Sequence, residues 1–180
     1  MFYRMIENKR NQWLASSECP INSIIEYIIK TGQMRDAQIE AIKTYLFLKI
    51  ACNNLPLVTL FKSGHFNTIN LNDAEISNNT REYLIAHPAA AALYEYACIK
   101  NDNGEQVSAK LEKQIRENPD SIDYGAVFDK IFYGVTYTDY LFSLPMGAGK
   151  TYLMAAFIYL DLYYAMNEPS NAAFAHNFII

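Results

Sequence analysis

The chain has 180 residues and a net charge of −4, from 15 Lys and Arg against 19 Asp and Glu, and 51% of its residues are hydrophobic. This apolar content is enough for a folded core and excludes disordered and low-complexity classes, and the length fits one domain or one domain plus part of another. The slightly acidic balance argues against a nucleic-acid coat protein or a polybasic membrane binder, so any nucleic-acid contact must come from a local patch.

The N-terminal segment lacks the features of a secretory signal, because charged residues interrupt it from Arg4 onward. The most apolar stretch, residues 144–166, is interrupted by Lys150 and Asp161 and falls short of the roughly 20 apolar residues of a membrane span. The three cysteines are widely spaced, which argues against a disulfide framework and a zinc ribbon. We therefore expect a cytoplasmic protein with no membrane partner.

Helical patterns dominate the first part of the chain. A dense apolar run predicts a mostly buried helix over residues 21–30, and apolar residues at helical spacing predict a second helix from an N-cap at Asp36 to about residue 51. The following segment shows no alternation long enough for a sheet. Its predicted helices are residues 57–62, 80–86, 89–100, 105–117 and 124–132.

The pattern changes near residue 136. Residues 136–143 are rich in β-branched and aromatic side chains and predict a strand, residues 150–166 predict a helix, and residues 177–180 resemble the start of another strand. The predicted fold class is therefore α/β and predominantly helical. N-terminal helices and a helical insertion precede a strand, a loop, a helix and a strand.

Between the predicted strand and helix lies Gly147-Ala148-Gly149-Lys150-Thr151, which has the form of a phosphate-binding loop. Glycines let backbone N–H groups approach phosphate oxygens, and a helix N-terminus adds partial positive charge. Lys150 would reach the β- and γ-phosphates of ATP, and the Thr151 hydroxyl would coordinate Mg²⁺.

The alternative is an ordinary glycine turn before a Lys-Thr pair, a string expected by chance on the order of once in a hundred chains of this size. The strand–loop–helix context favours the phosphate loop. Leu144 departs from the pattern, which has a small residue at that place.

Residues 144–151 resemble motif I of superfamily 2 helicases and translocases, particularly the DEAD/DEAH-type motors of type I and type III restriction enzymes. The family form is Ala-x-Thr-Gly-x-Gly-Lys-Thr, so Leu144 and Met146 replace the alanine and the threonine. The resemblance implies a RecA-like motor domain, with Lys150 as a catalytic residue.

A second segment, from Arg35 to Ile42, is similar to the family's Arg-x-x-Gln-x-x-Ala-Ile segment. The resemblance implies that Gln38 reads the adenine edge, with Arg35 nearby. The chemistry fits, because an amide offers the donor and the acceptor that adenine complements. The alternative is that Gln38 is a polar residue in the first turn of a helix.

More than a hundred residues separate Gln38 from Lys150, whereas the family usually places the two motifs a few turns of chain apart. We predict N-terminal helices over residues 1–52, a helical insertion over 53–137 and the start of a RecA-like ATPase domain over 138–180. No Asp-Glu-x-His or Asp-Glu-Ala-Asp string occurs. Asp161 follows an apolar run but lies within the predicted helix, so this chain alone is not expected to be catalytically competent.

The resemblance therefore implies the N-terminal part of an ATP-dependent DNA helicase or translocase that uses ATP and Mg²⁺. Its partners would be nucleic acid, with DNA favoured over RNA, and restriction or modification subunits. A second interpretation is a helical protein-interaction module with a vestigial phosphate loop. A third, a small phosphotransferase, is weakened because no acid-bearing strand or lid arginines follow the loop.

Overall fold

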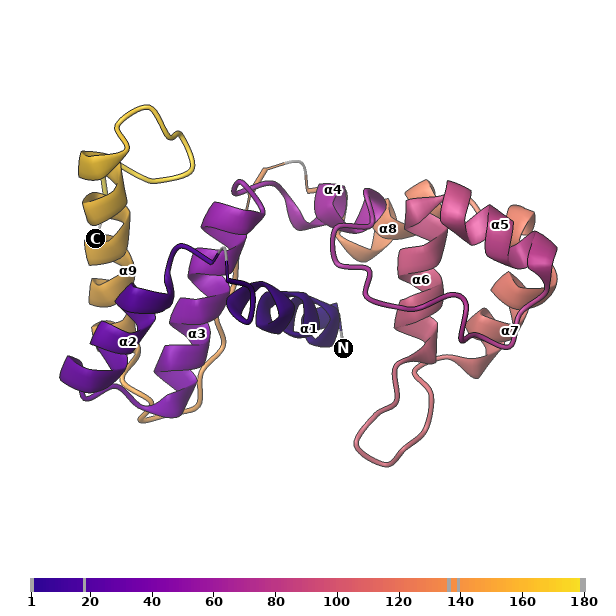
Figure 1. The fold of residues 1–180 in the computed structure, drawn as a ribbon, viewed down its shortest axis with the longest axis horizontal. Coiled ribbons are helices and arrows are strands. Elements are labelled where there is room, and N and C mark those ends of the chain that lie inside the picture. The colour runs from indigo at the N-terminus through magenta and orange to yellow at the C-terminus, as the bar shows by residue number, and fades with distance from the viewer. Residues whose placement is uncertain (1, 18, 136, 139, 179–180) are drawn as a thin grey trace. The chain divides into compact units, whose positions relative to one another are not determined.

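The computed structural model describes residues 2–17, 19–135, 137–138 and 140–178 (Figure 1). The α-helices are α1 (Phe2–Leu14), α2 (Asn22–Thr31), α3 (Asp36–Leu46), α4 (Leu57–Lys62), α5 (Asn78–Ala86), α6 (Pro88–Cys98), α7 (Ala109–Glu117), α8 (Tyr124–Ile131) and α9 (Lys150–Asn167). Two short elements complete the list, the π-helix η1 (Phe47–Ala51) directly after α3 and the 3₁₀-helix η2 (Pro119–Ser121).

The chain divides into two compact units. One is formed by residues 1–9 and 56–138, and the other by residues 10–55 and 139–180. Helix α1 contributes residues to both units, which are called here the middle unit and the loop unit. The loop unit contains both segments that resemble the helicase family.

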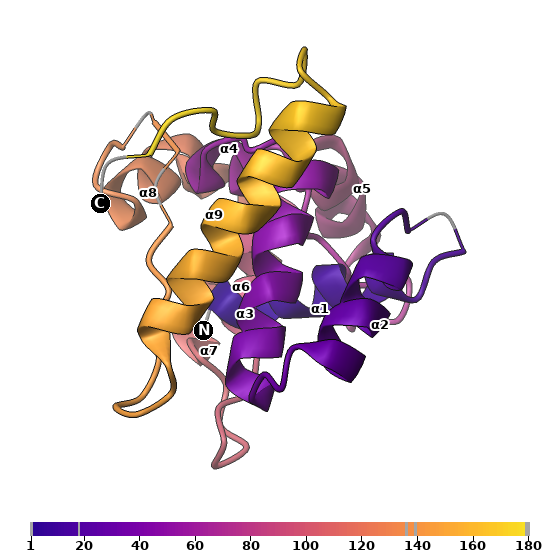
Figure 2. The same cartoon turned by 90° about the vertical axis from the view of Figure 1, so that its left-hand side faces the viewer.

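The loop unit is built around α3, which packs against both α2 and α9. Figure 2 shows α3 between these two helices. Its core includes Ile25 of α2, Ile42 and Leu46 of α3, and Leu153 and Leu160 of α9. Apolar residues recur at helical spacing along α3, so one continuous side of the helix is available to bury against its neighbours.

The start of the loop unit is fixed by a buried arginine on α1. The Arg10 side chain is 1% exposed, and its guanidinium donates to Thr44 Oγ1 at 2.7 Å and pairs with the Glu40 carboxylate at 2.6 Å. Burial raises the pKa of Glu40, but its hydrogen bond to Lys43 and the nearby positive charges outweigh burial and leave that pKa below its usual value. The C-terminal part of α1 is thereby attached to α3.

The middle unit is centred on α6, which packs against α4, α5, α7 and α8. Pro88 occupies the first turn of α6, where its missing N–H costs nothing, and Ala90, Ala91 and Ala92 are buried and permit close helix packing. Aromatic rings fill one side of this core. Phe2 stacks on Tyr96 with ring centroids 4.0 Å apart and meets the edge of Phe61 at 4.9 Å.

A loop of the middle unit is held by the buried carboxylate of Glu95 on α6. It accepts hydrogen bonds from the backbone N–H of Thr68 at 2.8 Å, from the Thr68 hydroxyl and from the N–H of Ile69 at 3.1 Å. Three donors on one carboxylate satisfy polar groups that would otherwise be buried without partners.

The predominantly helical prediction is confirmed, but the strand predicted over residues 136–143 is absent from the part of it that the structure describes. Residues 137–138 and 140–143 have no regular secondary structure, and Thr136 and Asp139 lie outside the described residues. A strand needs a neighbour to take its backbone hydrogen bonds, and within the described ranges the only β-pairing is an isolated bridge between Lys100 and Gln106.

The second predicted strand, residues 177–180, is also absent where it is described. Residues 177–178 have no regular structure, and 179–180 lie outside the described residues. In the described residues of these two segments, β-branched and aromatic composition therefore does not produce strands.

Helix ends differ from the predicted ones where side chains bind the backbone. Helix α7 begins at Ala109 rather than Glu105, because the side-chain oxygen Oδ1 of Asn101 accepts the N–H groups of Asn103 and Glu105 and holds them in a turn. Ser108 then caps the helix by accepting the Leu111 N–H at 3.2 Å. Helix α3 is capped by Arg35 rather than by Asp36, which is its first helical residue.

Candidate functional site: a glycine loop bonded to the start of α3

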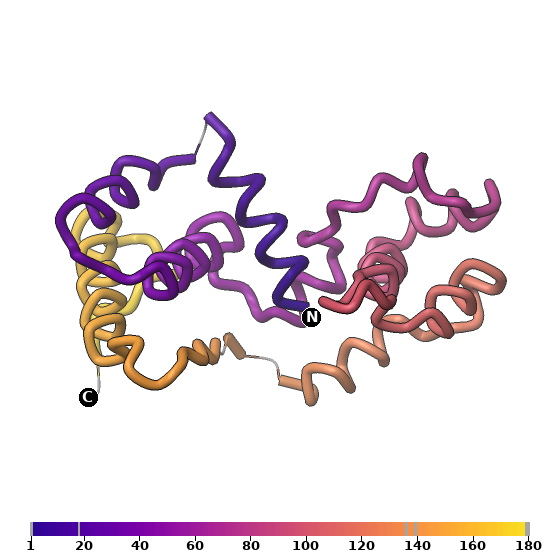
Figure 3. The backbone as a smooth tube through the Cα atoms, turned by 90° about the horizontal axis from the view of Figure 1, so that it is seen from below, coloured from indigo at the N-terminus to yellow at the C-terminus, as the bar shows by residue number. Residues whose placement is uncertain are grey.

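The predicted phosphate loop lies directly before α9, and Figure 3 follows the chain through residues 140–149 into that helix. Gly147 and Gly149 have φ angles of +78° and +74°, in the left-handed region that favours glycine. Between them, Ala148 is buried, and its N–H donates to the Pro145 carbonyl at 3.2 Å. The two glycines thus turn the chain tightly into the helix.

Lys150 and Thr151 form the first turn of α9 and are both exposed. The first N–H groups of a helix have no partners within it, and the aligned peptide dipoles give that end partial positive charge. A lysine ammonium, a threonine hydroxyl and these N–H groups are therefore accessible at one place. This combination is suited to binding a phosphate group.

Arg35 and Gln38, the two site residues predicted in the second segment, both form hydrogen bonds to this loop. The Arg35 guanidinium donates to the Gly147 carbonyl. Gln38 Nε2 donates to the Gly149 carbonyl at 3.0 Å across 111 positions of sequence. The structure thus brings Arg35 and Gln38 together with the glycine loop within one unit.

Gly149 and Gln38 are in close contact. A Cβ atom built on Gly149 would lie 2.7 Å from Gln38 Nε2, closer than real Cβ atoms approach other atoms. Two features therefore favour glycine at position 149: its positive φ, and the need for any added Cβ to displace Gln38 Nε2, which is held by its hydrogen bond to the Gly149 carbonyl. By contrast, a Cβ on Gly147 would meet no atom within 4 Å.

The Gln38 amide is already used by the protein itself. Its Oε1 accepts the backbone N–H of Arg35 at 2.9 Å while its Nε2 donates to Gly149, and the side chain is 3% exposed. An amide has two donors and two acceptor lone pairs, so one of each remains. The geometry shows Gln38 fixing the loop, and an adenine edge could use only the remaining pair.

A buried polar network in the loop unit joins α3, η1 and α9. The Asp161 carboxylate of α9 accepts from the Tyr45 hydroxyl at 2.6 Å and from the Ala175 N–H at 3.0 Å, and it pairs with Lys49 at 3.4 Å. Lys49 also donates to the Ala173 carbonyl at 2.6 Å. The prediction that Asp161 is a helix residue, and not an acid at the end of a strand, is confirmed.

This network changes the titration of its tyrosine. Burial, then the hydrogen bond to Asp161 and its negative charge, raise the pKa of Tyr45 far above its usual value, so its hydroxyl stays protonated and donates. Burial also raises the pKa of the Cys52 thiol, just after η1, to about 12, which makes it an unreactive cysteine at neutral pH.

Sequence reasoning missed several residues of this region. Tyr152, in the first turns of α9, donates its hydroxyl to the Gly32 carbonyl at 3.1 Å. Tyr45 and Lys49 were treated only as parts of a helix. Single polar residues on helices carry no local pattern, and only the three-dimensional contact between α3, η1 and α9 reveals their pairing.

No protein-family model, curated protein or solved structure matches this chain. Across the described ranges, no group of three or more His, Cys, Asp or Glu side chains is placed to hold a metal ion. Nor does any helix there have the length and apolar character needed to cross a membrane.

Proposed function

We propose that this chain binds Mg-ATP through the glycine loop and forms the N-terminal part of an ATP-dependent DNA helicase or translocase similar to the restriction-enzyme motors. The observation that carries the proposal is the bonding of Arg35 and Gln38 to the carbonyls of Gly147 and Gly149. The two segments resemble the same family separately in sequence. A chance match would give no reason for them to meet in the fold.

The proposed roles follow from the chemistry of each residue. The N–H groups of Gly147 and Gly149 would face phosphate oxygens, whereas the Ala148 N–H already donates to the Pro145 carbonyl. Lys150 would neutralise the β- and γ-phosphates, and Thr151 would provide an oxygen ligand for Mg²⁺. Arg35 and Gln38 would hold the loop, and Gln38 would offer its remaining donor and acceptor to the adenine edge.

The larger assembly is part of the same proposal. A RecA-like domain would provide a neighbour for the backbone of residues 136–143, and the whole motor would act on DNA in the cytoplasm with restriction or modification subunits. Hydrolysis requires an acid that orients water and arginines that stabilise the transferred phosphate. Asp161 is buried in its own network, so nucleotide binding is the property to test in this chain.

The test is a calorimetric titration of the 180-residue chain with Mg-ATP. Lys150→Ala should weaken binding at least tenfold, the equivalent of about 1.4 kcal/mol for the loss of a charge-assisted contact. Lys113→Ala, at a side chain 63% exposed on α7, is the matched control and should bind as the wild type does. An unchanged affinity for Lys150→Ala contradicts the phosphate-loop assignment.

A helical interaction module with a vestigial loop is the second candidate. Two apolar side chains next to the loop favour it, because Leu141 is 94% exposed and Met146 is 98% exposed. Isolated exposed apolar residues are common, but two of them in the segment just before a conformationally defined loop suit a protein contact. Complete absence of Mg-ATP binding by the folded wild-type chain would favour this candidate over the nucleotide-binding one.

A further inference from the structure

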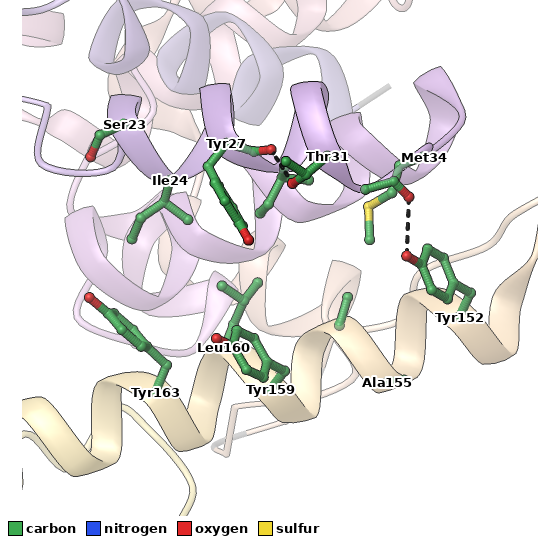
Figure 4. Close-up of a pocket in the computed structure, with 13 residues that line it drawn as sticks. Ser23, Ile24, Tyr27, Thr31, Met34, Tyr152, Ala155, Tyr159, Leu160 and Tyr163 are labelled. Atoms are coloured by element: carbon green, nitrogen blue, oxygen red, sulfur yellow. Dashed lines mark hydrogen bonds between the residues drawn. The ribbon is translucent and has the colours of Figure 1, made fainter.

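A groove of about 570 Å³ runs between α2 and α9 in the loop unit (Figure 4). Helix α3 packs against both of these helices, which leaves a space bounded by α2 on one side and α9 on the other. Leu160, which also belongs to the core, is buried at 3% exposure and lines this space. The groove therefore rests on the packed interior of the loop unit.

Tyrosines form much of its wall. Tyr27 comes from α2, and Tyr152, Tyr159 and Tyr163 come from α9. Figure 4 shows the Tyr27 ring above Tyr159, with the Met34 side chain near Tyr152 at one end. Tyr27 and Tyr159 are 69% and 68% exposed, so their rings are available to contact a ligand in the groove.

The groove has apolar faces and a few neutral polar groups. None of its lining residues carries a charge, in a chain of which 19% is charged. Two of its polar groups are already used, since the Tyr152 hydroxyl donates to Gly32 and the Thr31 hydroxyl donates to the Tyr27 carbonyl at 2.6 Å. The hydroxyls of Tyr27 and Tyr159 have no hydrogen-bond partner among the described residues and can bind a ligand.

We infer that this groove is a binding site for a flat, uncharged heteroaromatic ring. Aromatic side chains stack on flat rings, and the free hydroxyls supply the few directional bonds that orient a ligand. A charged group would lose its hydration there without gaining an opposite charge. The volume is in the range of small-molecule sites, roughly 300–1,000 Å³.

Two sources of such a ring are compatible with the position of the groove. Its Met34 and Tyr152 end is one residue from Arg35 and one residue from Thr151. The ring could thus belong to a nucleotide whose phosphates bind the glycine loop, or to a separate molecule. The site is inferred from the groove alone and does not rest on the proposed function.

The test uses Nile red, a flat uncharged dye whose fluorescence rises in apolar surroundings, titrated with the whole chain. Tyr27→Ala and Tyr159→Ala should each weaken dye binding roughly fivefold to tenfold through loss of stacking, and the pair together should weaken it further. Tyr3→Ala, at a tyrosine 49% exposed on α1 in the middle unit, is the matched control. It should leave the titration unchanged.

Circular dichroism checks that each variant remains folded, which is expected because the substituted side chains are largely exposed. Tyr27→Phe and Tyr159→Phe keep the rings and should retain most of the dye affinity. Dye binding that is the same in Tyr27→Ala, Tyr159→Ala and the wild type, or that falls equally in Tyr3→Ala, overturns the inference.

Competition distinguishes the two sources. If the ring is a nucleotide base, adenosine and Mg-ATP should both displace the dye, and Lys150→Ala should weaken displacement by Mg-ATP but not by adenosine. If it belongs to a separate molecule, Mg-ATP should leave the dye in place. If the chain binds the dye with the predicted dependence on the two tyrosines but does not bind Mg-ATP, the inferred ring-binding site stands and only the proposed function is contradicted.

Discussion

Gln38, in the first turn of α3, donates to the carbonyl of Gly149, the last residue before α9, at 3.0 Å. The same amide accepts the Arg35 N–H, so one side chain both caps α3 and holds the glycine loop. The conformation of the loop is therefore coupled to the start of α3. A ligand that moves Gly149 must also disturb the cap of α3.

Gly149→Ala should destabilise the loop unit by about 2–4 kcal/mol. The added methyl group would be strained at positive φ and would also collide with Gln38 Nε2. Gly147→Ala is the control, because it has the same sign of φ but open space around the new atom. It should cost only about 1–2 kcal/mol.

Thermal unfolding followed by circular dichroism measures both glycine variants. Equal losses in Gly147→Ala and Gly149→Ala would show that the contact with Gln38 has no energetic consequence, which contradicts the role assigned to it.

Asp161→Asn should destabilise the loop unit by about 3–5 kcal/mol, because it leaves the buried ammonium of Lys49 without its counter-charge. The control is Asp129→Asn, which breaks an ion pair with Lys62 at an aspartate 55% exposed. An exposed pair contributes less than about 1 kcal/mol. Denaturant unfolding compares the two, and a loss for Asp161→Asn as small as that for Asp129→Asn would argue against the buried network.

The stability of the loop unit should fall in alkaline solution because of Tyr45. Its pKa is raised in the folded state by burial and by Asp161, whereas the unfolded tyrosine ionises near its ordinary pKa of about 10. The folded state therefore holds a proton that the unfolded state releases, and this contribution, complete below about pH 10, is lost as the pH rises.

Tyr45→Phe removes that titration along with the hydrogen bond to Asp161. At neutral pH the variant should be less stable by about 1–3 kcal/mol, because the buried Asp161 Oδ1 loses the hydroxyl that donates a hydrogen bond to it. The difference in melting temperature between wild type and variant should stay constant below about pH 10 and narrow as the pH rises from about 10 to about 11. Parallel curves over this interval would contradict the assignment.

Glu95→Gln should loosen the loop at Thr68 and Ile69 in the middle unit. A carboxylate with two acceptor oxygens takes three donors there, and an amide has only one oxygen and adds two donors of its own. Hydrogen exchange at the Thr68 and Ile69 amides should accelerate about tenfold or more, as expected for roughly 1.5–3 kcal/mol. Exchange at Ala148, in the loop unit, serves as the internal reference and should not change.

Many of the helices could be predicted from the sequence, because local features of the sequence determine where they form. Apolar spacing predicted α3, the helix predicted over residues 150–166 is α9, and the helix predicted over residues 89–100 is α6, which begins at Pro88. The phosphate-loop motif led to a glycine turn directly before a helix. These features are determined by residues close to one another in the sequence, so a single sequence is enough to predict them.

The features that were not predicted depend on contacts between segments far apart in the sequence. Residues 1–52 were predicted to be helical as a region, but α1 was not placed individually, because much of its stability comes from tertiary contacts such as that of Arg10 with Glu40 and Thr44. The strand at 136–143 was predicted from composition, but a strand requires a neighbour that composition cannot supply. The bond between Gln38 and Gly149 joins residues 111 positions apart, and neither motif alone predicts it.

The division of the loop unit between residues 10–55 and 139–180 has a consequence for its synthesis. On the ribosome, α2 and α3 emerge early, but α9 follows only after the whole segment between them has been made. Until then the apolar side chains of α3, including Ile42 and Leu46, lack the helix that covers them. The segment between α3 and α9 can fold before α9 is made, so the apolar side of α3 stays partly uncovered and prone to aggregation until α9 has been synthesised.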